Sequence, residues 1–430
     1  MIALDILEPV SQEAVISVRR SLETKSNGAI DASIANFLAI MMQDPCYHGI
    51  RFNLLSNHAE IGVRLKNGEF SIRQWRDADE AWSRAYIESV YHVHSESKHL
   101  AALRLLFRSR EYNPIVQIVD DLKWDGEPHC ELFLHRWGKV EDSDYSREVS
   151  RLIFAGGIQR LYNPGAKFED VPVLTGDQGS GKSTLIRFLA IHDDYFTDEI
   201  RDMSGSKESI EALFGKWICE ISELSAFRRT DNESMKAFLS RKVDSYRTPY
   251  DRQVTNLPRR CIFIGSSNRR DFLTDLSGNR RWYPVEVHSN GYDIFAQEEE
   301  IRADVLQCWA EAREKFKTGT FPPYADRALL TQYRQAQEDA LESDWRPGVI
   351  EKYLSVKPHG YLVCIKEIWS DCLSPDSPAL PKRSDQTDIS QIMDRMPGWK
   401  KVGRQQTERY GRQRCWQKIV ADDSPDDLPF

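Results

Sequence analysis

An α/β fold with a mostly parallel sheet is predicted for the middle of this 430-residue chain by two observations. In VLTGDQGSGKSTLIRFLA, residues 173–190, an apolar run, a glycine-rich loop and an amphipathic run follow one another like a strand, a turn and a helix. Short apolar runs then alternate with helical patterns up to the sequence FPP at residues 321–323. Such alternation is typical of a parallel sheet covered by helices, and we assign it to residues 166–325.

The regions on either side have different patterns. Residues 1–165 are expected to be rich in helix, as in DASIANFLAIMM and DADEAWSRAYIESVY, with one hairpin in IGVRLKNGEFSIRQW. Residues 326–420 contain three short helical or mixed elements and then the basic segment GWKKVGRQQTERYGRQRCWQKIV, which reads as a hairpin. Three helices closed by a basic hairpin predict a winged-helix-like domain. Residues 421–430 form an acidic tail that is too polar to fold alone.

Composition limits the class of protein. With 40% hydrophobic and 29% charged residues, and no run of 18 apolar residues or basic-then-apolar leader, the chain is expected in the cytoplasm. Its cysteines are scattered, which favours neither disulfides nor a zinc site. The net charge is −8, yet residues 224–283 carry thirteen Arg or Lys against six acids, and residues 395–418 carry eight against one. These two basic segments are the places to expect contacts with nucleic acid.

The glycine-rich loop matches the pattern G-x-x-x-x-G-K-[ST] through Gly176, Gly181, Lys182 and Ser183. Glycines let backbone N–H groups point at phosphate oxygens, lysine reaches the β and γ phosphates, and serine binds Mg²⁺. We therefore predict a nucleoside triphosphate site with ATP and Mg²⁺ as its ligands. The residues expected to line it are Gly176, Asp177, Gln178, Gly179, Ser180, Gly181, Lys182, Ser183 and Thr184.

Hydrolysis requires an acid that holds the metal and a carboxylate that orients water. GKWICEISEL supplies Glu220 and Glu223, and their spacing does not put both on one face of a strand. We favour Glu220 as the metal ligand at a strand end, with Glu223 beyond the strand. Which of the two activates water is open, and either one could instead be a solvated glutamate at a strand end.

Two further motifs follow along the chain. RRCIFIGSSN is an apolar strand that ends in Asn268, where an amide could contact the γ phosphate, although an asparagine that caps a turn is an alternative. GNRRWYPV carries Arg280 and Arg281, and one of them is expected to act as an arginine finger toward the γ phosphate of a neighbouring subunit. A solvated basic turn is the competing interpretation.

Residues 113–287 resemble the virulence-associated E family, phage and mobile-element proteins related to superfamily 3 helicases of the AAA+ group. The resemblance is carried by NPIVQIVDDLKWDG, YNPGAKF, GDQGSGKST, KWICEISEL, MKAFLSRKVDSYRTPYDR, PRRCIFIGSSN and FLTDLSGNRRWYPV. This chain has Ser266-Ser267-Asn268 where relatives usually have Thr-Thr-Asn, and Cys219 at a usually aliphatic position. The resemblance implies an AAA+ P-loop core and a ring, expected to be a hexamer, that acts as an ATP-driven helicase in replication. No primase pattern is present, so a primase would be a separate polypeptide.

The resemblance also implies that residues 235–252 form a hairpin in the central pore, where cations follow the phosphate backbone and a tyrosine stacks on a base. The predicted contacts there are Lys236, Arg241, Lys242, Tyr246, Arg247, Tyr250 and Arg252. In the C-terminal hairpin, an origin duplex is expected to contact Lys400, Lys401, Arg404, Arg412 and Arg414. Ordinary salt bridges are the alternative for any one of the pore residues. For the C-terminal segment the alternative is a solvated hairpin whose aromatic residues make core contacts.

The last five residues, DDLPF, are similar to the acidic tip of bacterial single-stranded DNA-binding proteins, which suggests contact with host replication proteins or a primase. The leading interpretation is an ATP-dependent DNA helicase that translocates on single-stranded DNA as a ring. The alternative is an AAA+ ATPase switch that binds DNA or a partner protein and regulates it without unwinding.

Overall fold

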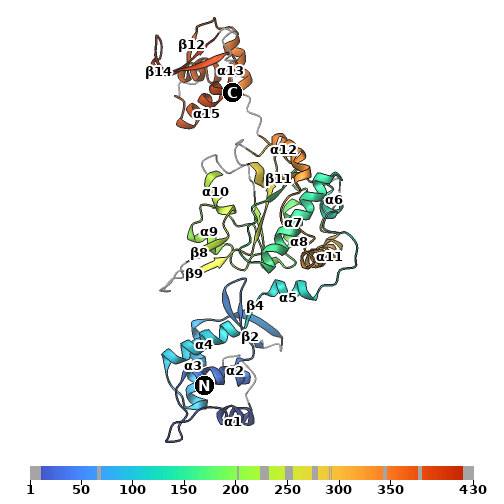
Figure 1. The fold of residues 1–430 in the computed structure, drawn as a ribbon, viewed down its shortest axis with the longest axis vertical. Helices are drawn as coiled ribbons and strands as arrows, with labels where there is room; N and C mark the ends of the chain where they lie inside the picture. The colour runs from blue at the N-terminus through green and yellow to red at the C-terminus, as the bar shows by residue number, and fades with distance from the viewer. Residues whose placement is uncertain are drawn as a thin grey trace, which may run out of the picture. The chain divides into compact units, whose positions relative to one another are not determined.

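The computed structural model describes residues 11–64, 69–200, 203–222, 232–246, 255–273, 279–289, 291, 293–341, 346–375 and 380–419 (Figure 1). The chain divides into two compact units, Met1–Leu341 and Glu342–Phe430. The predicted glycine-rich loop lies in the first unit and the basic hairpin lies in the second.

The first part of the first unit combines helices with a small sheet. The helices are α1 (Gln12–Arg20), α2 (Ile34–Gln43), α3 (Asp77–Tyr91) and α4 (Glu96–Ser109), and the strands are β1 (Ile50–Asn53), β2 (His58–Arg64), β3 (Phe70–Gln74) and β4 (Glu111–Tyr112), in the order β3-β2-β1-β4. The predicted helical character is confirmed, as is the β2–β3 hairpin, whose turn lies outside the described residues. Strands β1 and β4 were not predicted, because four and two residues are too few to show an alternating pattern.

A five-stranded parallel sheet forms the centre of the first unit, as predicted. Its strands are β5 (Val171–Thr175), β6 (Phe196–Thr197), β7 (Ile218–Ile221), β10 (Ile262–Ser267) and β11 (Trp282–Glu286), in the order β11-β5-β10-β7-β6. Every neighbouring pair is parallel. The carboxyl ends of β5, β10 and β7 therefore lie side by side along one edge.

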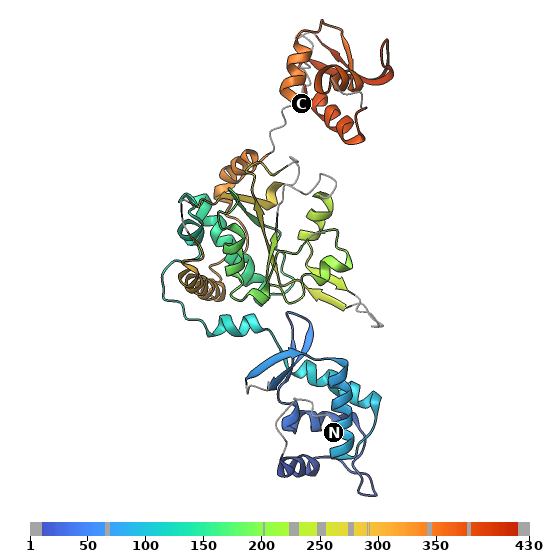
Figure 2. The ribbon, with the colours of Figure 1, turned by 180° about the vertical axis from the view of Figure 1, so that it is seen from behind.

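Side chains that alternate along these strands enter two cores, one on each face of the sheet. Leu174 and Ile264 pack with α7 (Asp144–Tyr162), α8 (Lys182–Leu189) and α11 (Glu298–Lys317). Val173 and Phe263 pack on the other face with α10 (Asn232–Leu239). Figures 1 and 2 show these helices on opposite sides of the sheet. Burial on both faces explains why the strands read as apolar runs in the sequence.

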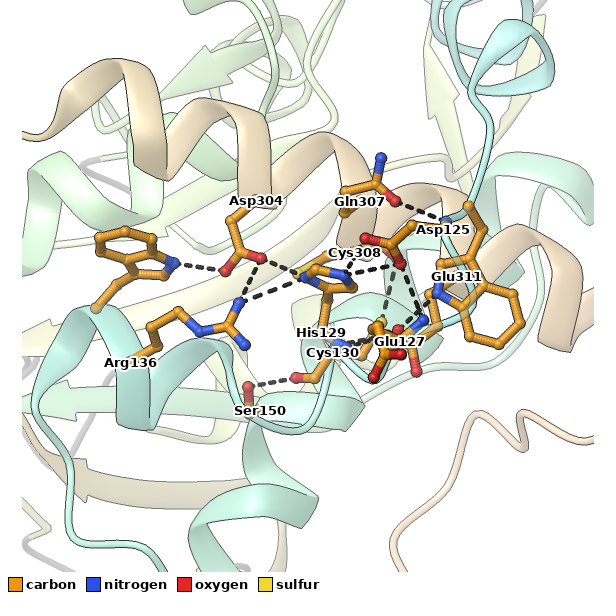
Figure 3. A network of polar contacts seen from close by, with 12 residues as sticks. Asp125, Glu127, His129, Cys130, Arg136, Ser150, Asp304, Gln307, Cys308 and Glu311 are labelled. Carbon is orange, nitrogen blue, oxygen red and sulfur yellow. Dashed lines mark hydrogen bonds and ion pairs between the residues drawn. The ribbon is translucent and has the colours of Figure 1, made fainter.

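Helix α11 is held in place by a network of buried and partly buried polar groups (Figure 3). Asp304 accepts hydrogen bonds from Arg136 at 2.6 Å and contacts the His129 ring at 2.5 Å, and Glu311 accepts from the backbone N–H of His129 at 2.7 Å. These contacts join α11 to the segment around α6 (Phe133–Gly138). Trp309 donates to the carbonyl of the last residue of α8 at 2.9 Å. Helix α11 therefore also holds α8, the helix that follows the glycine-rich loop.

Other elements of the first unit are α5 (Pro114–Asp121), α9 (Lys207–Glu211), α12 (Leu330–Asp339) and the antiparallel pair β8 (Val243–Tyr246) and β9 (Thr255–Pro258). None of the helices in the described part of the chain is long and apolar enough to cross a membrane. All eight cysteines are free thiols.

The second unit contains α13 (Arg346–Ser355), β12 (Leu362–Cys364), α14 (Ile365–Glu367) with a π-helical extension, α15 (Arg383–Arg395), β13 (Trp399–Thr407) and β14 (Gly411–Lys418). The strands form an antiparallel sheet in the order β12-β14-β13. Ile389, Met393 and Trp416 are fully buried in its own core. The predicted helical elements and the basic hairpin are thus both present.

Candidate functional site

The glycine-rich loop, residues 176–181, connects β5 to α8 and takes a backbone path that only glycine tolerates well. Gly176, Gly179 and Gly181 have φ angles of 140°, 81° and 85°. A Cβ at Gly176 would lie 2.3 Å from the carbonyl oxygen of Val287. Between these glycines, Asp177, Gln178 and Gly179 are exposed. The loop therefore presents its backbone to solvent at the N-terminus of α8, where partial positive charge favours anions.

Lys182 is the first residue of α8, and its ammonium group lies over the loop. It is 6% exposed, and Nζ donates to the carbonyls of Gly176 at 2.9 Å and Asp177 at 2.8 Å, and to Ser180 Oγ at 3.2 Å. Burial lowers the pKa of Lys182, against the charges of Asp177 and Glu220, which raise it. An ammonium group held by neutral carbonyl and hydroxyl acceptors would gain a stronger partner in an anion bound at the loop.

Glu220 lies on β7 and is fully buried. Its Oε1 accepts hydrogen bonds from Ser183 Oγ and Ser266 Oγ, both at 2.6 Å. Its Oε2 is buried and has no hydrogen-bond partner among the described residues. Burial raises the pKa of the Glu220 carboxyl, two serine hydrogen bonds and Lys182 lower it, and Asp198 raises it further. An unpartnered buried carboxylate oxygen next to a serine hydroxyl is a donor set that suits Mg²⁺.

Asn268 follows β10 at the same edge of the sheet. Ser267 is paired with Thr175 in the parallel register, so Asn268 comes beside the start of the glycine-rich loop. The residue is exposed, and none of the described residues bonds its side chain. Lys182, Ser183, Glu220 and Asn268, four residues predicted from three motifs, thus meet at one edge. Thr184 is half-buried one residue further along α8, without a hydrogen bond from its side chain within the described part.

Arg280 and Arg281 lie in a short 3₁₀ turn, Asn279–Arg281, that leads into β11. Glu169 holds both of them, because its Oε1 accepts from Arg280 at 3.1 Å and its Oε2 from Arg281 at 3.0 Å. Arg281 also donates to Ser240 Oγ at 3.1 Å, and its Nε is buried without a partner in the described part of the chain. The Arg281 side chain is 13% exposed and that of Arg280 is 72% exposed.

This arginine pair lies at the opposite edge of the sheet from the glycine-rich loop. Strand β11 runs parallel to β5 with Trp282 beside Val171, so the residues before β11 are at the amino ends of the strands. The loop follows the carboxyl end of β5. The structure therefore does not bring Arg280 or Arg281 to the loop of their own chain.

The predicted pore hairpin is described only in part. Its base is the β8–β9 pair, where Lys242 is exposed and Arg241 lies 4.0 Å from Asp244. Lys236 is half-buried on α10. Tyr246 ends β8, but its side chain lies outside the described residues. The predicted residues Arg247, Tyr250, Arg252 and Glu223, together with the acidic tail 421–430, also lie outside the described residues.

In the second unit, Arg404, Arg412 and Arg414 are exposed on the hairpin, and Lys400 is exposed at its base. Lys401 is engaged, because its ammonium group donates to Asp394 at 2.7 Å. These residues remain predicted DNA contacts.

Three residues at or near these sites were not predicted from motifs. Ser266 and Ser183 both donate a hydrogen bond to Glu220. The sequence signal for Ser266 was a polar residue in an apolar strand. Asp198 follows β6, where Thr197 is paired with Cys219, and so comes beside Glu220. Glu169 had no sequence signal, because its hydrogen-bond partners Ser240 and Arg280 are more than seventy residues away in the chain.

The fold and this edge define the class of protein, a parallel α/β protein with a strand, glycine-rich loop and helix next to a buried acid. The family model for the virulence-associated protein E-like domain matches residues 119–343, which is more than half of the chain. The chain belongs to this family, as the sequence resemblance indicated. Membership suggests an enzymatic role in the replication of a mobile element.

Comparison with solved structures gives distant matches. One is the apo structure of the NrS-1 C-terminal region (305–718), at 13% identity and a TM-score of 0.46, covering 86% of this chain and 96% of that one. Another is the A form apo structure of the same region, at 12% identity and a TM-score of 0.41, covering 81% and 84%. TM-scores below 0.5 support no inference about fold or function. A search of curated proteins found no match.

Proposed function

We propose that this chain is an ATP-dependent DNA helicase of a prophage or mobile-element replication module, which translocates on single-stranded DNA as a ring. The observation that carries the proposal is the meeting of Lys182, Ser183, Glu220 and Asn268 at the carboxyl edge of β5, β7 and β10. Parallel α/β proteins bind their ligands at this edge. Separate motifs that converge on one edge support an AAA+ P-loop core.

In this proposal the loop and Lys182 bind the phosphates of ATP. Ser183 and Glu220 would hold Mg²⁺, because a serine hydroxyl and an unpartnered buried carboxylate oxygen are the ligands that it prefers. Bound Mg²⁺ supplies positive charge that neutralises the phosphate oxygens. Asn268 orients the γ phosphate with its amide. The carboxylate that orients water is left to Glu220 or Glu223.

The position of the arginine pair supports catalysis between subunits. Arg280 and Arg281 lie at the edge away from their own loop, so either can reach only a nucleotide bound by another copy. Arg280 is the better finger, since its side chain is 72% exposed and Glu169 is its only partner among the described residues. A ring, which we propose to be a hexamer, places each loop beside the arginine pair of the next subunit.

DNA contacts are proposed for the β8–β9 hairpin in the pore and for the second unit. The base of β8–β9 carries the exposed Lys242, and the chain around it is one of the two basic segments. Cations follow a phosphate backbone without regard to sequence, as a translocating enzyme requires. A separate primase or a host replication protein is the proposed partner of the acidic tail.

Strand displacement from a forked duplex tests the proposal. The wild-type chain with ATP and Mg²⁺ is expected to release the labelled strand, and Lys182→Ala is expected to release none. Lys317→Ala is the matched control, because Lys317 is 53% exposed at the end of α11 and far from the loop in sequence. Turnover of ATP without strand release on any fork would favour the non-unwinding ATPase switch.

A further inference from the structure

The side of helix α15 that faces away from the core of the second unit is polar. Ile389 and Met393 point into the core of the second unit, and the residues on the other side of the helix, at four-residue spacing, are Arg383, Thr387 and Gln391. All three are exposed. No described residue bonds the side chains of Arg383 and Gln391, and the Thr387 hydroxyl donates only to the carbonyl of Arg383 at 3.0 Å.

Each acid of α15 has a partner within the second unit. Asp388 pairs with Arg346 at 3.0 Å, and Asp394 pairs with Lys401 at 2.7 Å. Asp385 accepts a hydrogen bond from the backbone N–H of Lys382 at the helix N-terminus, at 2.9 Å. The outer face therefore combines the uncharged hydrogen-bonding side chains of Thr387 and Gln391 with the Arg383 side chain, which no described residue bonds, a composition suited to an anionic, hydrogen-bonding ligand.

The hairpin β13–β14 adds a row of arginines. Arg404 is directly opposite Arg414, and Arg412 is opposite Gln406, so the three arginines share one face. Directly opposed like charges destabilise a strand pair. None of the three forms an ion pair within the described residues, and the nearest side-chain contact is from Arg414 to Ser390 Oγ at 3.5 Å. A polyanion bound along this face would remove the repulsion.

Helix and hairpin are fixed to one another. Asp394, near the end of α15, accepts hydrogen bonds from Lys401 at the base of β13 and from Trp416 Nε1 on β14 at 2.8 Å. Ser390 on α15 lies next to Arg414. These contacts fix the distance between the polar face of α15 and the row of arginines on the hairpin. A protein that contacts a regular double helix at two places needs such a fixed distance.

The aromatic residues of the hairpin argue against single-stranded DNA as the ligand, because binding of single strands depends on exposed rings that stack on bases. Trp416 is fully buried. Tyr410 is half-buried and its hydroxyl donates to Asp371 at 2.9 Å. Trp399 is also half-buried. The face thus offers phosphate and base-edge contacts, which are the contacts that a duplex needs.

We propose that the second unit reads duplex DNA, with α15 in the major groove and the hairpin on the adjacent phosphates. Gln391 and Thr387 contact base edges, glutamine being suited to adenine. Arg404, Arg412 and Arg414 bind backbone phosphates. The proposal deepens the proposed replicative role, because it assigns origin recognition to a helix that the sequence did not single out. An RNA duplex is a poor ligand, since its deep major groove does not admit a helix.

The proposed contacts of the hairpin with phosphates are tested by measuring the affinity of the full-length chain for a blunt, labelled DNA duplex of random sequence. The measurement is made without nucleotide, over a series of salt concentrations. Replacing both Arg404 and Arg412 by alanine is expected to lower the slope of log affinity against log salt by about 0.9 for each phosphate that is no longer neutralised. Arg412→Lys keeps the charge and is expected to keep the slope. Lys352→Ala is the control, because Lys352 is an exposed lysine of the same unit that lies on α13, outside both the hairpin and α15.

The proposed contacts of α15 with base edges are tested by selecting duplexes from a randomised pool with the wild-type chain. A preferred sequence is expected, and Gln391→Ala is expected to lose about tenfold in affinity for it while binding of random duplex is unchanged. A pool without enrichment, or a preference that survives replacement of both Gln391 and Thr387, would show that α15 does not read bases. An unchanged slope in the double arginine variant would remove the hairpin from the proposal.

These measurements are independent of unwinding. ATP turnover of the same variants, assayed with single-stranded DNA, is expected to stay at the wild-type level, which also reports that the first unit is folded. Wild-type duplex binding without any strand displacement would therefore refute the helicase proposal alone. Equal affinity for DNA and RNA duplexes would instead refute placement of α15 in the major groove.

Discussion

Replacing Glu220 by glutamine is expected to stop ATP hydrolysis and, at the same time, to stabilise the folded chain. Glu220 is fully buried, and its Oε2 has no partner among the described residues. Glutamine has the same shape and keeps an oxygen that can accept from Ser183 and Ser266, but it has no charge to bury. The substitution is therefore expected to lower the activity of the proposed metal site and to raise the stability of the fold.

The direction of the stability change follows from the pKa of Glu220. Burial raises this pKa above the ordinary value of 4.5, so the folded chain binds the proton more tightly than the unfolded chain does. This contribution to stability is complete below pH 4.5 and is lost as the pH rises through the folded pKa. At neutral pH the variant is therefore expected to gain on the order of 1 kcal/mol, the difference between leaving a carboxylate and an amide unsatisfied. That is a rise of about 2 °C in Tm.

Thermal melting without nucleotide, from pH 4 to pH 8 in roughly unit steps, measures the effect over the window in which the linkage acts. Glu311→Gln is the matched control. Glu311 is also fully buried, but Lys315 and the backbone N–H groups of Cys130 and His129 bind it and hold its pKa below the usual value, although burial alone would raise it. Its contribution is present above pH 4.5, so this variant is expected to melt below the wild type at neutral pH.

Hydrolysis by Glu220→Gln is expected to fall by about 100-fold or more, as for loss of a metal ligand. The rise in Tm on adding ATP with Mg²⁺ is expected to be smaller for the variant than for the wild type. A variant that turns over ATP at the wild-type rate would exclude Glu220 as the metal ligand. A variant that melts below the wild type at neutral pH would show that the Glu220 carboxylate is stabilised in the fold.

Four other substitutions address the remaining roles. Lys182→Ala is expected to abolish nucleotide binding, measured by calorimetry, and retained binding would overturn the loop assignment. Arg280→Ala is expected to lower ATP turnover by about 1000-fold, and mixing it with Lys182→Ala subunits should restore part of the activity if the finger acts between copies. Arg281→Ala in the same mixture tests the alternative finger. Glu169→Gln leaves the partly buried Arg281 without its anionic partner, and is expected to lower the free energy of unfolding in urea by about 1 kcal/mol, with no change if the pair is only a solvated contact.

The sequence was sufficient for features that depend on local chemistry. The glycine-rich loop could be located because φ angles of 140°, 81° and 85° are ones that glycine adopts readily, and their spacing is fixed by the turn. The parallel sheet could be predicted because strands buried on both faces read as apolar runs. Glu220 could be singled out because a charged residue in such a run needs a reason to be buried.

Features that depend on long-range packing could not be predicted. The bonds from Glu169 to Arg280, Arg281 and Ser240 join parts of the chain that have no common motif. The exposed face of α15 could not be singled out because its residues are ordinary surface residues in sequence. Only the burial of Ile389 and the partners of its aspartates show which face is left open.

The separation between the two edges of the sheet has a consequence for the whole molecule. Strand β5 has five residues, which is a length of about 16 Å. Glu169 precedes this strand and the glycine-rich loop follows it, so the two lie at least this far apart along the strand direction. That distance exceeds the reach of an arginine side chain, and β11 and β5 are packed too tightly in one sheet to slide past each other. Under the proposed function, a single copy would therefore bind ATP at one edge of the sheet and would offer its arginines to another copy from the other edge. If Arg280 acts in hydrolysis at all, the geometry requires a head-to-tail arrangement of copies, and a closed ring is the form in which every site is complete.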